Sequence, residues 1–316
     1  MPPQSGGMEI RMEKIAIGMV LFCPDERERL KLAIKKAISQ ADGIYIFDNS
    51  PEKNSDLSDI KEENVIYMTE NKNKGIAYAL NKIMARAKED GYKWVVTMDQ
   101  DSILPDGLIE DYKRHLYDND NIAIICPQII DKRRAYMKVS ESETQEYIEE
   151  CITSASCTNI EIWEKVGRFD EWLFIDLVDN EFCKRLQING YSILRLNKWV
   201  LDQEFGKIKP KSKQQQQFWL KLSKILNSPN IAKFSYYKYV SPARVYYTSR
   251  NIIYVNKKLK KYGPVAYKNY NCKGYAGFII SFIIPSFLRA QQKGKVLRAI
   301  IKGTADGIKK KVTPMQ

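Results

Sequence analysis

An unbroken apolar segment at residues 15–23 constrains the fold of this chain more than any other feature. It is followed by Pro24 and three charged residues rather than by small residues suited to cleavage, so we do not interpret it as a signal peptide. An apolar run of this length, without polar alternation, is typical of a strand buried on both faces of a parallel sheet. The segment is therefore predicted to be the first strand of an α/β sheet.

Strand and helix patterns then alternate over roughly the first 130 residues. Helical spacing of apolar side chains is found in residues 25–38 and 73–88. Short apolar runs typical of strands are found at residues 43–47, 64–68, 94–98 and 122–126. This alternation predicts an α/β fold with right-handed crossovers, in which ligands bind beyond the carboxyl ends of the strands.

Polar residues follow two of these strands at the point where each strand ends. Asp48-Asn49-Ser50 follows the second strand, and Asp99-Gln100-Asp101 follows the fourth. Mg²⁺ and Mn²⁺ prefer oxygen ligands, commonly one or two carboxylates together with substrate phosphates. Asp99 and Asp101 fit that chemistry, although the same two residues also suit a turn or a helix cap. A D-x-D pair alone is common by chance.

Several kinds of site are excluded by what the sequence lacks. His115 is the one histidine, which excludes a multi-histidine metal site and argues against a histidine-dependent triad. The phosphate-binding patterns G-x-x-x-x-G-K-[ST] and G-x-G-x-x-G do not occur. The six cysteines form no C-x-x-C pair and indicate reduced thiols in a cytosolic protein. A phosphate would therefore be held by a divalent metal bound to carboxylates.

Charge is distributed unevenly along the chain. Residues 207–316 contain 24 Lys and Arg and one acid, a net charge of +23, whereas residues 1–206 contain 27 basic and 37 acidic residues, a net charge of −10. Such a basic region suits an anionic lipid surface or a nucleic acid. We therefore expect a flexible leader at residues 1–12, an α/β domain at 13–206 and a basic helical C-terminal region at 207–316.

The basic region contains one strongly apolar segment, residues 277–285. It is too short to span a membrane but could lie in the membrane interface, surrounded by Lys and Arg. The alternative is a helix packed on the α/β domain, with the amphipathic basic helix expected at residues 297–311 exposing its charged face to solvent. Both interpretations stay open at this point.

Five or more segments together resemble family 2 glycosyltransferases, especially their rhamnosyltransferase-like members. Residues 93–106, KWVVTMDQDSILPD, resemble the D-Q-D-S that follows an apolar strand in that family. In order along the chain, the other matches are residues 48–50 to D-N-x-S, 73–81 to N-x-G-x-A-x-x-x-N, 176–185 to D-x-V-D-x-E-[WF]-C-x-R, and 247–251 and 299–307 to looser segments. The resemblance implies a GT-A fold, a Rossmann-like mixed sheet flanked by helices, with a helical C-terminal extension.

The resemblance also implies roles for individual residues. The implied set is Asp179 as catalytic base; Asp48, Asn49, Gly75, Asn81, Asp99 and Gln100 for the donor nucleotide; Asp99, Asp101 and Gln203 for Mg²⁺ or Mn²⁺; and Trp172, Asp176 and Glu181 for the acceptor.

Each of these residues also has a plain structural interpretation: a helix start for Gly75 and Asp179, a polar helix position for Asn81, core packing for Trp172, and helix capping for Asp176 and Glu181. Many family members have a histidine where this chain has Gln203, which leaves the metal dependence open.

The expected function is that of an inverting, divalent-metal-dependent glycosyltransferase. The resemblance implies transfer from a nucleotide donor, dTDP-rhamnose or alternatively a UDP-hexose, to a hydroxyl of a lipid-linked cell-surface polysaccharide intermediate. The protein would be cytoplasmic and peripheral on the inner face of the cell membrane.

Two hypotheses come from other classes of protein. One is a nucleic-acid-binding module with Tyr and Lys interleaved in residues 233–275, which lacks a recognised motif and is opposed by the acidic α/β domain. The other is a non-catalytic scaffold, and Gln203 is the one feature that favours it.

Overall fold

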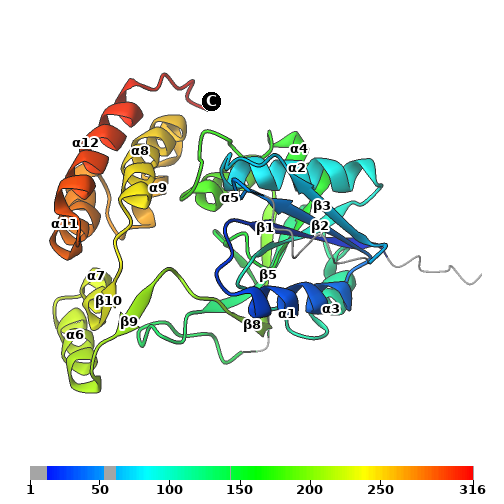
Figure 1. The fold of residues 1–316 in the computed structure, drawn as a ribbon, viewed down its shortest axis with the longest axis horizontal. Coiled ribbons are helices and arrows are strands. Elements are labelled where there is room, and N and C mark those ends of the chain that lie inside the picture. The colour runs from blue at the N-terminus through cyan, green and yellow to red at the C-terminus, as the bar shows by residue number, and fades with distance from the viewer. Residues whose placement is uncertain (1–12, 53–61, 143, 316) are drawn as a thin grey trace, which may run out of the picture.

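The structure is a computed structural model that describes residues 13–52, 62–142 and 144–315 (Figure 1). The expected leader at residues 1–12 lies outside the described residues. Figure 1 shows a helix-covered sheet on one side and a group of helices on the other, in which the long helix α8 (Pro242–Lys258) lies alongside α12 (Lys293–Lys309). We call residues 207–315 the C-terminal lobe.

Among the described residues, the central sheet has eight strands in the order β3-β2-β1-β4-β7-β5-β8-β6. The strands are β1 (Ile15–Leu21), β2 (Gly43–Asp48), β3 (Val65–Thr69), β4 (Trp94–Asp99), β5 (Ile122–Ile130), β6 (Gln145–Ile148), β7 (Ser156–Asn159) and β8 (Ser192–Asp202). The first four run parallel, whereas β7 pairs antiparallel with β4 and β5, and β6 pairs antiparallel with β8. The sheet is therefore mixed, as expected.

Helices cover both faces of this sheet because β1 is buried on both (Figure 1). Its residues Ile15, Ile17 and Met19 pack toward α1 (Arg27–Ile38) and α3 (Leu108–His115). Its residues Ala16 and Val20 belong to the opposite core, with α2 (Ile76–Glu89), α4 (Ile160–Lys165) and α5 (Val178–Ile188). The apolar pattern of residues 15–23 is unbroken because successive side chains of this strand pack alternately into two separate cores.

The C-terminal lobe is mainly helical. It contains β9 (Ile208–Pro210), α6 (Lys213–Ile225), α7 (Pro229–Ala232), η2 (Lys233–Ser235), β10 (Tyr236–Lys238), α8, η3 (Lys260–Tyr262), α9 (Val265–Lys268), α10 (Tyr275–Phe278), η4 (Ile279–Ile283), α11 (Ile284–Arg289) and α12 (Lys293–Lys309). The short strands β9 and β10 pair antiparallel. Within the described ranges, no helix is long and apolar enough to span a bilayer.

The C-terminal lobe shares its core with the α/β domain. Ile252, Val255 and Phe278 belong to the same buried cluster as the residues of α2 and α5. The start of the C-terminal lobe at residue 207 is therefore a boundary in charge and in secondary structure, but the apolar packing continues across it.

Two glycines allow α12 to lie directly on α8. A Cβ atom added at Gly303 would overlap the carbonyl oxygen of Tyr246, and one at Gly307 would lie 2.5 Å from the carbonyl oxygen of Arg250. Lys257 Nζ donates to the carbonyl oxygen of Gly307 at 3.1 Å, which joins the two helices at this close approach. The small residues thus set the distance between the last helix and the helix that docks on the α/β domain.

We expect Gly303→Ala to destabilise this packing, because backbone atoms of α8 occupy the space that the methyl group needs. The melting temperature should fall, with a loss of about 1–3 kcal/mol in the free energy of unfolding. Gly294→Ala is the matched control, since a Cβ atom at that position of α12 meets nothing within 4 Å. Equal melting temperatures for the two variants would contradict the close approach.

Candidate active site

The carboxyl ends of β2, β1 and β4 bring the two polar clusters to one edge of the sheet. Leu21 of β1 is in register with Asp48, and Val20 is in register with Asp99. Gln100 Oε1 accepts a hydrogen bond from the backbone N–H of Phe22 at 2.8 Å, which ties the turn after β4 to the end of β1. The two strand-end clusters therefore flank β1 at the edge where α/β sheets bind ligands.

Asp48 and Asn49 are held at this edge by hydrogen bonds to the neighbouring strand and loops. Asp48 is completely buried and accepts hydrogen bonds from the backbone of Ser50 at 2.9 Å and the hydroxyl of Tyr67 at 2.5 Å. Asn49 donates to the carbonyl oxygen of Gly75 at 3.0 Å and accepts from the backbone N–H of Lys74 at 3.2 Å. Asn49 thereby fixes the loop that leads into α2.

Gly75 and Asn81 contact the segment that leads to α5. Gly75 has a φ of 91°, and an added Cβ atom would lie 2.8 Å from Phe174 Cα. The Asn81 side chain donates to the carbonyl oxygen of Phe169 and accepts from its backbone N–H, at 2.9 and 3.0 Å. Both residues hold residues 169–175 in place, which is a structural contact that the sequence pattern did not indicate.

Asp179 occupies the first turn of α5 after a sharp change of chain direction. Asp176 and Leu177 both have left-handed φ values, 67° and 66°. Asp179 lines a hollow of about 220 Å³ with Thr97 and Thr153, beside the last residues of β4. The turn thus directs a carboxylate toward the end of the strand that carries Asp99.

The pKa of Asp179 is raised to about 6, chiefly by burial and also by the negative charges of Asp176 and Glu150, against opposing hydrogen bonds from the backbone. A carboxylate with a pKa close to neutrality takes up a proton more readily than an ordinary aspartate and still ionises at pH 7. The arrangement is chemically suited to general base catalysis.

Asp99 lies beside the buried polar side chain of Gln203. The Gln203 Nε2 donates to Asp99 Oδ2, and Gln203 is 5% exposed. Its Oε1 is buried and has no hydrogen-bond partner within the part of the chain that the structure describes. The pKa of Asp99 is raised to about 6, chiefly by burial and also by the nearby charges of Asp101 and Asp179.

This donor set fits a divalent cation. Two carboxylates, Asp99 and Asp101, and one unpartnered amide oxygen, from Gln203, are hard oxygen ligands of the type that Mg²⁺ and Mn²⁺ prefer. The described ranges contain no group of three or more His, Cys, Asp or Glu side chains placed to hold a metal ion. Binding here would therefore depend on the Gln203 oxygen and on phosphate oxygens of the donor.

The three residues expected at the acceptor have different surroundings. Asp176 accepts hydrogen bonds from Arg244 Nε and Thr248 Oγ1, both at 3.2 Å, and so faces α8. Glu181 is 0% exposed and binds Arg185 and Lys258 through contacts of 2.7 Å. A fully buried and doubly paired carboxylate has no face toward an acceptor, so the structure gives Glu181 a structural role instead.

Trp172 is also engaged by the protein itself. Its ring lies 4.5 Å from the guanidinium of Arg250 and 4.1 Å from the ammonium of Lys310. Arg250 additionally donates to the carbonyl oxygen of Trp172. The ring therefore forms part of the contact between the α/β domain and the C-terminal lobe.

Arg244 is a site residue that the sequence pattern did not single out. It pairs with Asp176 through both Nε and Nη2, and its positive charge lowers the pKa of Asp99. It lies more than 60 residues beyond Asp176 in the sequence, at the start of α8, and no motif marks it. Only the folded chain brings this cation to the carboxylates.

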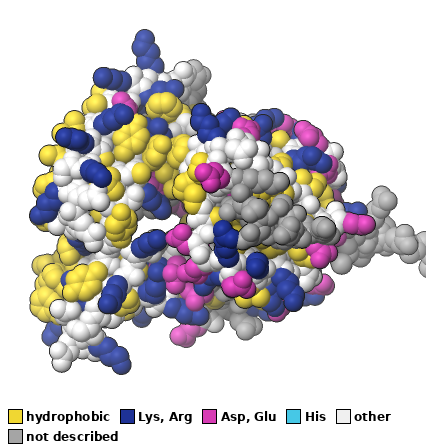
Figure 2. Space-filling model, viewed as in Figure 1, with side chains coloured by type: hydrophobic (Ala, Val, Ile, Leu, Met, Phe, Trp, Pro, Cys, Tyr) yellow, Lys and Arg dark blue, Asp and Glu magenta, His cyan; other side chains and the backbone are white. Residues whose placement is uncertain are grey.

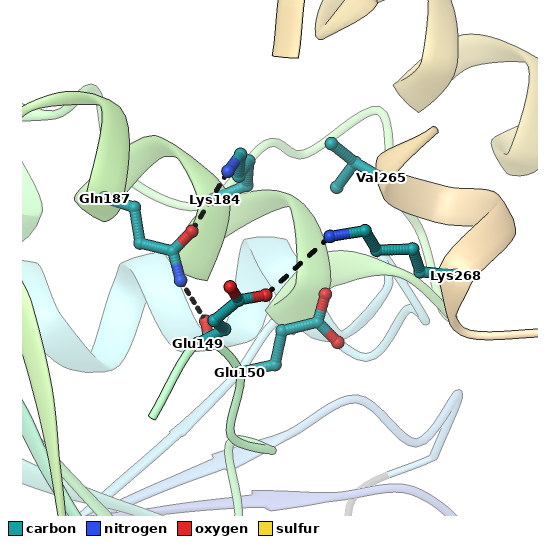
Figure 3. Close-up of a pocket in the computed structure, with 6 residues that line it drawn as sticks. All are labelled: Glu149, Glu150, Lys184, Gln187, Val265 and Lys268. Carbon is teal, nitrogen blue, oxygen red and sulfur yellow. Dashed lines mark hydrogen bonds and ion pairs between the residues drawn. The ribbon is translucent and has the colours of Figure 1, made fainter. Parts of the chain in front are cut away.

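A second hollow of about 240 Å³ lies on the other side of α5 (Figure 3). Figure 3 shows Lys268 of α9 pointing toward Glu149, with an ion-pair distance of 3.8 Å, and Gln187 of α5 bonded to the backbone of Glu149. The side chain of the next residue, Glu150, accepts a hydrogen bond from Asn180 at 2.8 Å. This crevice supports the segment beside Asp179 and is lined by groups that already pair with one another.

Comparison with known proteins finds a family that matches part of this chain. The model of glycosyl transferase family 2 matches residues 20–169, just under half of the chain, and this segment includes both strand-end clusters. Residues 20–169 are thus similar to a family 2 glycosyltransferase domain. The resemblance described above is thus confirmed, while Asp179 and Gln203 lie beyond the matched segment.

Relatives of this family 2 domain agree with it. A dTDP-rhamnosyl transferase, RfbF, of Shigella flexneri is 31% identical over 153 residues, which are 44% of this chain and 50% of the relative. The chain therefore matches about half the length of that curated relative.

Solved structures show the fold of the family 2 domain and its surroundings. The crystal structure of GalNAc-T7 with UDP, GalNAc and Mn²⁺ has a TM-score of 0.50 at 10% identity, covering 87% of this chain and 57% of that one. The crystal structure of S. aureus TarS 1-349 has a TM-score of 0.47 at 13% identity, covering 93% and 89%. The predicted GT-A fold is confirmed.

We expect Asp179→Asn to stabilise the folded protein at neutral pH. The native pKa of Asp179, about 6, lies above the ordinary aspartate value of 3.8, so ionisation weakens folding as the pH rises through this interval. Removing the charge should raise the free energy of unfolding by about 1–2 kcal/mol at pH 7.5, and by much less at pH 4.

Urea denaturation of both proteins at the two pH values measures this effect. Asp120→Asn, which removes an exposed acid, is the matched control and should change nothing. An Asp179→Asn variant that is less stable than the wild type at pH 7.5 would show that the carboxylate is not held under electrostatic strain.

Proposed function

We propose that this protein is an inverting glycosyltransferase that moves a sugar from a nucleotide donor to a hydroxyl group, with Asp179 as the catalytic base. The observation that carries the proposal is the position of Asp179, a half-buried carboxylate with a pKa of about 6, beside the Asp99-Gln100-Asp101 edge of a segment that matches family 2. Base and donor site then approach the reacting carbon from different elements, α5 and β4.

The reaction is a single displacement. The acceptor hydroxyl oxygen bonds to the anomeric carbon, the bond from that carbon to the diphosphate oxygen breaks, and the hydroxyl proton passes to Asp179 Oδ. Attack opposite the leaving group inverts the configuration. Gly75 and Asn81 contribute by holding residues 169–175, because a shift of that segment would move Asp179 away from the acceptor.

The donor side is proposed to use Mg²⁺ or Mn²⁺. Asp99, Asp101 and Gln203 Oε1 would hold the cation, and a bound cation neutralises charge on the departing nucleoside diphosphate. Asp48, Asn49 and Gln100 would shape the pocket for the nucleotide. The similarity to a dTDP-rhamnosyl transferase supports dTDP-rhamnose as donor, with a UDP-hexose as the alternative.

The acceptor is proposed to be a lipid-linked glycan on the inner face of the cell membrane. Ile280 and Leu288, which are 70% and 64% exposed, and Ile284 follow one another at helical spacing on η4 and α11. Figure 2 shows hydrophobic and basic side chains intermixed over the C-terminal lobe. We call Ile280, Ile284 and Leu288 the apolar stripe, and an exposed stripe amid cations suits an anionic membrane surface.

A donor panel tests the proposed transfer. Hydrolysis of dTDP-rhamnose, with UDP-sugars for comparison, should require Mg²⁺ or Mn²⁺ and stop with EDTA. Asp179→Asn should lower kcat about 10²–10⁴-fold, and wild-type kcat should fall as the pH drops through about 6 because the base becomes protonated.

The control for this experiment is Asp120→Asn, which should retain full activity. If no sugar nucleotide is bound or hydrolysed, the enzyme proposal fails and the scaffold or nucleic-acid-binding hypothesis gains. Full activity of Asp179→Asn would instead remove only the assignment of the base.

Vesicle sedimentation tests the membrane proposal. Ile280→Gln combined with Leu288→Gln should weaken binding to phosphatidylglycerol-containing vesicles about tenfold, since two exposed apolar anchors are lost. Leu32→Gln combined with Tyr147→Gln changes two exposed apolar residues of the α/β domain and should leave binding unchanged. Equal binding of both double variants would rule out the apolar stripe as the membrane contact.

A further inference from the structure

Several cations of the C-terminal lobe gather without carboxylate partners. Lys233 lies on η2, Lys238 ends β10, and Arg289 ends α11. None of the three forms an ion pair with an acid in the described part of the chain, although Lys233 donates to Asn230 Oδ1 at 2.8 Å. Arg134, from the loop after β5, shares Asp131 with Arg133 and so adds a further partly balanced charge.

Aromatic rings hold these cations in one place. Tyr136 and Tyr236 stack with their centroids 6.3 Å apart. Arg134 donates to the Tyr136 hydroxyl at 3.0 Å and its guanidinium lies 5.3 Å from the Tyr236 ring. Arg289 lies 4.2 Å from the ring of Phe234 on η2. We call Arg134, Lys233, Lys238 and Arg289 the cationic cluster.

The members of the cationic cluster repel one another. The pKa of Lys233 is lowered to about 8, chiefly by burial and also by the charges of Lys238, Arg134 and Arg289. Burial also lowers the pKa of Lys238 and of Arg289. Like charges brought together in a partly buried place destabilise the fold unless an anion shares the place, and such groups concentrate at functional sites.

The cationic cluster adjoins the apolar stripe at one end and Asp176, near the proposed base, at the other. Arg289 directly follows Leu288, the last residue of the stripe. At the other end, Lys238 is close enough to Asp176 and Arg244 for their charges to change its pKa, and Asp176 precedes Asp179 by three residues. An acceptor reaching Asp179 from the stripe would therefore pass these cations.

We propose that the cationic cluster binds a phosphoryl group carried by the acceptor. This rests on the proposed transferase function and adds a chemical class of acceptor to it. A phosphate or diphosphate presents several oxygens and up to two or more negative charges, which match guanidinium forks and ammonium groups that converge from different elements. The nearby acids do not compete for it, because Asp131 and Asp176 already pair with arginines.

Calorimetric titration with inorganic pyrophosphate, in EDTA to exclude a metal-dependent donor site, tests this proposal. The wild type should bind pyrophosphate, and Lys238→Gln combined with Arg289→Gln should bind it at least about tenfold more weakly. Lys260→Gln, an exposed change of the same kind on η3, should bind like the wild type. The proposal is overturned if the wild type does not bind or if all variants bind alike.

A second readout separates binding from folding. Lys238→Gln removes a repelled charge, so without ligand it should melt at or above the wild-type temperature, while pyrophosphate should raise that temperature less than in the wild type. Lys238→Arg keeps the charge and should retain the ligand-induced rise. A Lys238→Gln protein stabilised by pyrophosphate as much as the wild type would count against the cluster.

Two further arms identify the source of the phosphate. Vesicle binding of the double variant should stay within about twofold of the wild type, since membrane contact rests on the apolar stripe. The KM for donor hydrolysis should also stay within about twofold. Loss of vesicle binding alone would assign the cluster to lipid headgroups, and a raised donor KM would assign it to the donor diphosphate; either result overturns the proposal. Pyrophosphate binding needs no sugar transfer, so failure of the transferase proposal is recognised separately.

Discussion

A buried network around Glu181 joins the parts of this protein that form the candidate site. Glu181 binds Arg185 within α5 and Lys258 at the end of α8, while Lys258 also reaches Asp170. Removing one partner of such a network leaves a buried charge uncompensated, which is destabilising by several kcal/mol. The network therefore fixes α8 against the segment that carries Asp179, and geometry at the base depends on it.

The same docking makes the C-terminal lobe part of the site. Asn251 of α8 donates to the carbonyl oxygens of Ile175 and Asp176 at 2.8 and 2.9 Å. The left-handed backbone conformation begins at Asp176. That turn would otherwise leave two carbonyl groups without partners as well as a strained backbone. A helix far along the sequence thus stabilises the turn that leads to the Asp179 carboxylate.

Local pattern explains which features could be predicted from the sequence. The strands at residues 15–21 and 94–99 and helix α2 were predicted to within a few residues, because apolar periodicity is a local property. The strands β6, β7, β9 and β10, which have three or four residues, were not predicted, and neither was the longer strand β8 (Ser192–Asp202). The turn of Asp99-Gln100-Asp101 at a strand end was predicted for the same local reason.

Contacts between distant segments explain what the sequence could not give. Gly75 is required by the backbone of Phe174, about 100 residues away, and the burial of Glu181 depends on Lys258. Arg244 and the cations of the C-terminal lobe come near the candidate site only because helices and short strands that are distant in the sequence pack together. Motif resemblance identifies the residues that match a family pattern. Burial and pairing then decide whether such a polar side chain faces a ligand or the core.

Like charges gather at two places near Asp179, negative charges at one and positive charges at the other. Asp99, Asp101 and Asp179 crowd negative charge at the sheet edge, and Lys233, Lys238 and Arg289 crowd positive charge in the C-terminal lobe. The fold would be more stable if the two groups neutralised each other, yet Asp176 and Arg244 pair between them and absorb only one charge of each sign. Each surplus therefore supports the proposed ligands, a cation at the sheet edge and an anion at the cationic cluster.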